Sequence, residues 1–69
     1  MAKLTRLGKM VKRHCLERGI TQTELARKLG MSKIYLSKIM YGYRPPGKYT
    51  EALARELGID PEVVRALAA

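Results

Sequence analysis

One stretch of 23 residues, residues 20–42, constrains the fold of this chain more than any other. It reads ITQTELARKLGMSKIYLSKIMYG and predicts two short helices joined by a tight turn. Thr21 and Glu24 form a capping box, in which side chains pair the free backbone N–H groups at the start of a helix. Gly30 ends that helix, because glycine adopts the left-handed conformation of a helix end without strain. Ser32 can then cap the second helix directly after the turn.

The apolar residues of this stretch indicate how the two helices pack. Leu25, Ala26 and Leu29 fall on one face of the first helix. Ala26 is small, which allows another helix to cross closely at a steep angle. Leu36 and Ile39 give the second helix only a narrow buried stripe. The rest of the second helix carries cations, hydroxyls and one isoleucine that the core does not explain.

The positions of these residues form a recognisable motif. It runs Thr21-Gln22-x-Glu24-Leu25-Ala26, Leu29-Gly30-Met31-Ser32, Leu36-Ser37-x-Ile39 and Gly42. This motif resembles the helix-turn-helix of the phage repressor and Cro family, closely over residues 20–42 and loosely over the whole chain. The resemblance implies a compact five-helix bundle of the lambda-repressor-like type, with the helix-turn-helix at its second and third helices.

The remaining sequence predicts a single all-α domain over residues 1–69. A chain this short makes one domain with a small core, and it shows no run of strand-like alternation. Helices are expected at about residues 3–18, 22–29, 33–41, 47–57 and 61–68. Asp60 is expected to cap the last helix, with Pro61 at its first position.

Three residues of the first helix bear on chemistry and stability. Gly8 is expected to weaken the helix by roughly 1 kcal/mol relative to alanine. His14 and Cys15 fall on the core side, and one histidine with one cysteine cannot make a four-ligand zinc site. No nucleophile–base set is evident either. We therefore expect no enzyme activity, no metal, no cofactor and no small-molecule substrate.

The chain departs from the family at two positions. Many relatives carry an arginine at the position of Cys15 and a glutamate at the position of Met40, and those two residues form an ion pair. Here both partners are replaced together, so no charge is left unpaired, and such replacements are often neutral or stabilising. We expect Cys15 and Met40 to be buried and to pack against each other.

Positive charge is concentrated in the part of the chain that holds the motif. The net charge is +8, with +10 in residues 1–48 and −2 in residues 49–69. Such one-sided charge is typical of a protein that binds the nucleic-acid backbone. A basic surface kept for solubility is the alternative, but it fits a segregated pattern less well. A single cysteine and the lack of a long apolar run favour a cytoplasmic protein without a membrane segment.

The resemblance also implies which residues meet double-stranded DNA. The second helix of the motif, residues 32–41, should enter the major groove. Lys33 can then donate to guanine, and Ile34 can pack on a thymine methyl group. Backbone N–H groups near Tyr43 and at the start of the helix expected at residues 47–57 are predicted to hold phosphates. The tyrosines could instead cover the edge of the core. The predicted DNA-binding residues are Gln22, Ser32, Lys33, Ile34, Tyr35, Ser37, Lys38, Tyr41, Tyr43 and Arg44.

Relatives of this size act as two-fold dimers on palindromic sites. Ile59, Val63 and Leu67 are the predicted dimer contact, in a homodimer whose stability can depend on DNA. The alternative is that the last helix simply docks on its own core. The expected function is sequence-specific DNA binding by a small transcriptional regulator, either a repressor or a Cro-like protein. The alternative function is an antitoxin, or another protein-interaction module of this fold, that binds its own operator.

Overall fold

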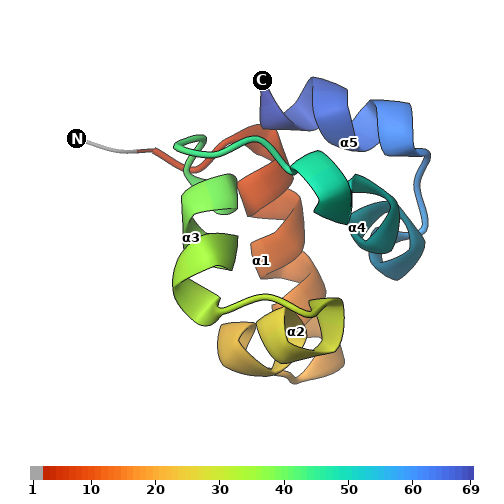
Figure 1. Cartoon of the computed structure of the whole chain (residues 1–69). Helices are drawn as coiled ribbons and strands as arrows, with labels where there is room; N and C mark the ends of the chain where they lie inside the picture. Colours follow the sequence, from red (N-terminus) through yellow and green to blue (C-terminus); the bar gives the residue numbers. More distant parts are fainter. Residues whose placement is uncertain (1–2) are drawn as a thin grey trace.

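A computed structural model describes residues 3–69, and every regular element in that range is helical. The elements are α1 (Arg6–Arg18), α2 (Gln22–Leu29), α3 (Lys33–Met40), the 3-10 turn η1 (Gly47–Tyr49), α4 (Thr50–Leu57) and α5 (Pro61–Ala68). Figure 1 shows α1 and α3 side by side, α2 at one end of this pair, and α4 and α5 beyond α1. The fold is the predicted all-α bundle. None of the described helices has both the length and the apolar character needed to cross a membrane.

All five helices contribute side chains to one core. Its buried apolar members are Leu7, Val11, Cys15, Leu25, Ala26, Leu29, Leu36, Ile39, Met40, Leu53, Ala54 and Val64. Leu36 and Ile39 are fully buried, and burying side chains of this size stabilises a fold by about 1.5–3 kcal/mol each. These two residues therefore anchor α3 by one narrow stripe, as predicted, and the opposite side of α3 remains in solvent.

The first helix begins at Arg6, later than the predicted start near residue 3. Thr5 is its cap: the backbone of Thr5 is extended, and its Oγ1 accepts a hydrogen bond from the N–H of Gly8 at 3.0 Å. The N–H and the Oγ1 of Thr5 also donate to the carbonyl oxygen of Met40, at 2.9 and 3.0 Å. Thr5 thus joins the start of α1 to the end of α3, a role that the sequence analysis missed.

Gly8 has a packing role that outweighs its poor helix propensity. A Cβ atom at this position would overlap the carbonyl oxygen of Met40 and would lie 2.9 Å from Cδ2 of Leu4. Any other residue would therefore push α1 and α3 apart. The prediction that Gly8 is merely a weak point of the helix is wrong, because the glycine is what allows this close approach.

The C-terminal half differs from the prediction at the start of α4 and in how the start of α5 is capped. The helix predicted from residue 47 is divided: η1 comes first, and α4 begins at Thr50, whose Oγ1 donates to the Gly47 carbonyl at 2.6 Å. Asp60 does occupy the N-cap position of α5, but its side chain makes no capping hydrogen bond. Its backbone carbonyl accepts from the N–H groups of Val63 and Val64 instead, at 3.0 and 3.1 Å.

Cys15 and Met40 are both buried in the core, as expected. The main chain of Met40 meets α1 at Thr5 and Gly8, about two helical turns from Cys15. A direct contact between the two side chains therefore stays a prediction. Burial, with a smaller contribution from the charge of Glu56, raises the pKa of the Cys15 thiol. The thiol consequently stays protonated and unreactive, as a core residue should.

Candidate nucleic-acid interface

The helix-turn-helix begins with a complete capping box. Thr21 Oγ1 accepts from the N–H of Glu24 at 3.0 Å, and the Thr21 N–H donates to Glu24 Oε1 at 2.8 Å. The hydrogen bond from the Thr21 N–H is the main cause that lowers the pKa of Glu24, because it favours the ionised carboxylate. Gln22 follows as the first residue of α2 and is half-buried.

A glycine turn sets the direction of α3. Gly30 has a φ of +79°, and the N–H of the following Met31 donates to the Ala26 carbonyl at 2.9 Å. This is the hydrogen-bond pattern of a Schellman helix end. The Met31 side chain packs against the core at this corner. Ser32 then caps α3, its Oγ accepting from the N–H of Tyr35 at 3.1 Å. The predicted helix end and the predicted cap are both confirmed.

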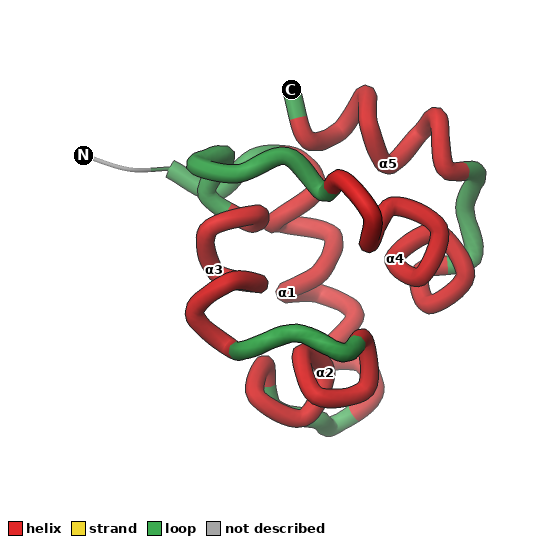
Figure 2. The backbone as a smooth tube through the Cα atoms, viewed as in Figure 1, coloured by secondary structure: helices red, strands yellow, loops and turns green. Residues whose placement is uncertain are grey.

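The outer face of α3 is open to solvent. In Figure 2, α3 lies at the edge of the bundle, with the other helices to one side of it. Lys33 and Lys38 are exposed, and the side chain of Ile34 is 69% exposed. An isoleucine this accessible does not stabilise the core, so it is free to contact a ligand.

Six of the predicted DNA-binding residues line one groove of about 410 Å³. They are Lys33, Ile34, Ser37, Lys38, Tyr41 and Tyr43. Together they present two ammonium groups and three hydroxyls, and none of the six carries a carboxylate. Such a surface donates hydrogen bonds and attracts anions, which suits the phosphates and acceptor-rich base edges of nucleic acid.

The other four predicted residues lie outside this groove. Gln22 stands at the start of α2, Ser32 uses its hydroxyl as the cap of α3, and Arg44 is exposed in the following loop. Tyr35 is half-buried against the core, with its ring centroid 5.5 Å from that of Tyr49. Tyr35 therefore covers the edge of the core, which is the alternative that the sequence left open for the tyrosines.

The loop after α3 folds back onto the helix that precedes it. The N–H groups of Tyr43 and Arg44 both donate to the carbonyl oxygen of Lys38, at 2.9 and 3.3 Å. The expectation that these backbone groups would hold phosphates is therefore wrong, since they are already paired within the protein. Their hydrogen bonds instead fix the loop beside the exposed face of α3. Gly42 permits this turn with a φ of +81°.

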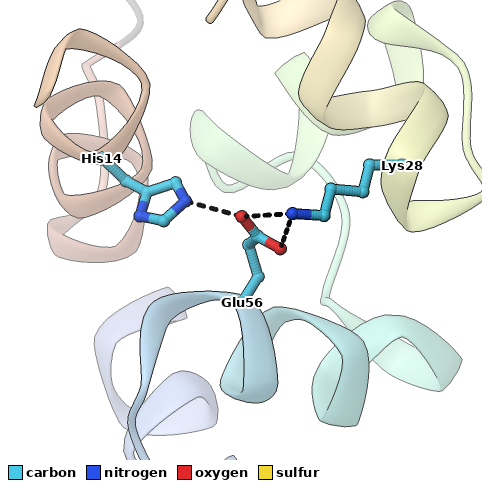
Figure 3. Close-up of polar contacts among 3 residues, drawn as sticks. All are labelled: His14, Lys28 and Glu56. Carbon is cyan, nitrogen blue, oxygen red and sulfur yellow. Dashed lines mark hydrogen bonds and ion pairs between the residues drawn. The ribbon is translucent and has the colours of Figure 1, made fainter. Parts of the chain in front are cut away.

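A polar cluster that joins α1, α2 and α4 was not predicted. Figure 3 shows Glu56 of α4 between His14 of α1 and Lys28 of α2. Glu56 Oε2 lies 2.7 Å from His14 Nε2, and Oε1 lies 3.1 Å from Lys28 Nζ. The hydrogen bond with His14 is the main cause that lowers the pKa of Glu56; Lys28 adds to it and burial opposes it. No local spacing could reveal this cluster, because His14 and Glu56 are 42 residues apart.

This geometry makes His14 a structural partner of Glu56, in keeping with the buried imidazole that the sequence predicted. Within residues 3–69, no cluster of three or more His, Cys, Asp or Glu side chains has the arrangement needed to hold a metal ion. The described part of the chain also leaves no buried side-chain nitrogen or oxygen without a hydrogen bond.

A capped pair of helices, crossing at a glycine turn and exposing the second helix, defines a helix-turn-helix domain of the lambda-repressor-like type. Comparison with known proteins agrees. The family described as "Helix-turn-helix" matches residues 11–64, and the chain belongs to this family, in the phage repressor and Cro-type group of DNA-binding regulators.

Two phage proteins are similar to this chain. Repressor protein C of Rhizobium phage 16-3 is 43% identical over 49 residues, which cover 71% of this chain and 19% of that protein. The ImmF control region 10 kDa protein of Bacillus phage phi105 is 38% identical over 61 residues, which cover 87% of this chain and 68% of that protein. The chain thus spans about a fifth of the first relative and about two thirds of the second. No solved structure matches the chain significantly.

Proposed function

We propose that this protein is a small sequence-specific transcriptional regulator that binds double-stranded DNA with α3 in the major groove. The observation that carries the proposal is the exposed face of α3, whose cations and hydroxyls line one groove without any carboxylate. The major groove of B-DNA is wide enough to admit an α-helix. The names of the two relatives, a repressor and a control-region protein of phages, support a regulatory role.

Within this proposal the exposed residues divide between two tasks. Lys33, at the start of α3, reads the guanine acceptors O6 and N7, because the N-terminal residues of a recognition helix come nearest to the bases. Lys38 lies further along the same groove. Gln22, Tyr43 and Arg44 flank α3 and bind phosphates, which position the protein without reading sequence.

Selection of bound sequences from a random duplex pool at moderate salt tests the proposal directly. A regulator of this kind enriches one motif, and two copies acting together enrich that motif as an inverted repeat about one helical turn apart. Enrichment of no motif, with binding that depends only on salt concentration, would show that the basic surface serves another purpose.

Substitutions separate the two tasks. Lys33→Ala should reduce the binding free energy on the selected duplex by about 1–3 kcal/mol and should relax the sequence preference at one base pair per half-site. Arg44→Ala should weaken all sequences alike and lower the slope of log affinity against log salt by about one. Lys12→Ala removes an exposed cation of α1 and is the matched control. If Lys33→Ala lost the same amount of affinity for specific and for random DNA, the role of Lys33 as a base reader would be refuted.

We also propose that two copies bind together, through α5 and the loop before it. One helix reads only a few base pairs, so a second copy is needed for a site of useful length. Val63 is 40% exposed, whereas Ile59 and Leu67 are half-buried and pack partly against the core. The three side chains offer a small apolar surface, which favours a dimer that forms on DNA rather than in free solution.

A further inference from the structure

The groove along α3 contains one apolar side chain among polar ones, and that side chain is Ile34. We infer that Ile34 reads the 5-methyl group of a pyrimidine, so that affinity for the binding site depends on one methyl group per half-site. The inference rests on the proposed function and adds to it the chemical feature that α3 selects.

The position of Ile34 places it among the groups that face the ligand. Successive residues of a helix are about 100° apart, which puts Ile34 between Lys33 and Lys38 on the face that lines the groove. Its side chain is 69% exposed, so the isoleucine makes little use of the core. A contact with an apolar group of the DNA would bury the side chain of Ile34. The lysines on either side would at the same time bind acceptor atoms of the DNA close to that apolar group.

The neighbouring side chains favour an apolar reader at an A·T pair. Adenine is usually read by Asn or Gln, and cytosine by Asp or Glu. Residues 25–50 contain none of these four residue types. Ammonium groups recognise acceptors, but acceptors occur on guanine, adenine and thymine alike. Ammonium donors therefore discriminate poorly at an A·T pair, whereas the 5-methyl group of thymine is an apolar mark in the major groove.

Replacing thymine by deoxyuridine removes only this methyl group and gives the decisive test. The probe is the duplex of highest affinity from the random pool, with deoxyuridine placed at each thymine in turn. One position per half-site should weaken binding to the unaltered protein about fourfold, the effect expected for one buried methyl group. The same replacement should leave the affinity of Ile34→Ala unchanged.

A second probe separates the methyl group from the rest of the base. At the position found by the first probe, cytosine and 5-methylcytosine should differ by a similar factor of about four for the unaltered protein. They should bind Ile34→Ala equally. Agreement between the two probes would assign the effect to the methyl group and not to the hydrogen-bonding edge of thymine.

Leu16→Ala is the matched control, because Leu16 is an aliphatic residue of α1 that is 76% exposed and lies outside the groove. It should preserve the thymine-to-deoxyuridine ratio. Neither residue belongs to the buried core, so both variants should keep the helical circular dichroism and melting temperature of the unaltered protein. A methyl effect that persists in Ile34→Ala, or that is absent at every thymine, would overturn the inference. If the random pool yields no motif at all, the proposed function itself fails.

Discussion

Gly8 lies where α1 meets the last turn of α3, and its missing side chain leaves room for the Met40 carbonyl oxygen. Alanine is the better helix former by about 1 kcal/mol. Its methyl group would nevertheless force the two helices apart, and overpacking of this kind typically costs about 1–3 kcal/mol. We therefore predict that Gly8→Ala destabilises the protein by about 1–3 kcal/mol, measured by urea unfolding.

Lys9→Ala is the control for this prediction, because Lys9 is the next residue and is exposed. An exposed substitution should change the free energy of unfolding by less than about 0.5 kcal/mol. An increase in stability for Gly8→Ala would mean that helix propensity outweighs packing at this position.

Residues whose partners lie three to five positions away could be predicted from the sequence. The bonds of Thr21 with Glu24, the left-handed turn at Gly30 and the cap at Ser32 are all present as expected. The contacts of Thr5 and Gly8 with Met40 could not be predicted, because Met40 is more than thirty residues away. The cap that Thr5 provides for the N–H of Gly8 is local, and the sequence analysis missed it by starting the helix near residue 3. Local spacing holds no information about which backbone atom a distant helix will bring into contact.

The helices are held together by polar contacts as well as by the core. Glu56 of α4 joins His14 of α1 to Lys28 of α2 (Figure 3). The pKa of Glu56 is lower in the folded protein than its ordinary value, chiefly because of the hydrogen bond with His14. The contacts of the ionised carboxylate therefore stabilise the fold above that ordinary value, and this stabilisation is lost as the pH falls through the lowered pKa.

Glu56→Gln should accordingly reduce stability at neutral pH and have a smaller effect in acid. The expected loss in the free energy of unfolding at neutral pH is about 1.5–3 kcal/mol, the usual contribution of a hydrogen bond to a charged group. Urea unfolding at neutral pH and again in acid would show the difference in unfolding free energy between the two proteins narrowing as the pH falls toward the lowered pKa of Glu56. Glu51→Gln, an exposed position on the first turn of the same helix, should show no such trend. A constant difference at both pH values would contradict the assignment.

At the level of elements, the all-helical fold, the exposed face of α3 and the start of α5 at Pro61 followed from the sequence, whereas the starts of α1 and α4 did not. Thr5 at the start of α1 and Thr50 at the start of α4 each donate a hydrogen bond to a backbone carbonyl, that of Met40 and that of Gly47, which the apolar pattern of the sequence does not indicate. Tyr35 was predicted to contact DNA, but its ring packs against that of Tyr49, which belongs to a separate element. Aromatic residues near a small core can face either way, and only the packing decides.

Charge and shape together describe how the whole molecule would meet DNA. Residues 1–48, which include the helix-turn-helix, have a net charge of +10, whereas α4 and α5 lie entirely within residues 49–69, which have a net charge of −2. The long-range field therefore attracts the duplex toward the half that carries α3. This distribution leaves the less basic α5 on the side proposed for the contact with a second copy.

Two copies on one duplex should touch only at their edges. The molecule measures 29 × 26 × 20 Å, and adjacent half-sites lie about 34 Å apart. A contact made by Val63 with the half-buried Ile59 and Leu67 is small beside the roughly 1,200–2,000 Å² that stable interfaces bury. In sedimentation experiments the free protein should therefore be monomeric, and two copies should bind an inverted-repeat duplex cooperatively.

Val63→Asp tests this arrangement, because it places a charge on the predicted contact at a position that the core does not require. The variant should bind a single half-site normally and lose cooperativity on the inverted repeat, so that one-to-one complexes accumulate at low protein concentration. Leu16→Asp places the same charge on α1, outside the predicted contact, and should remain cooperative. Cooperative two-to-one binding by Val63→Asp would show that residues other than Val63 make the dimer contact. One-to-one binding by the unaltered protein would refute the proposed dimer, but it would not contradict DNA recognition by α3.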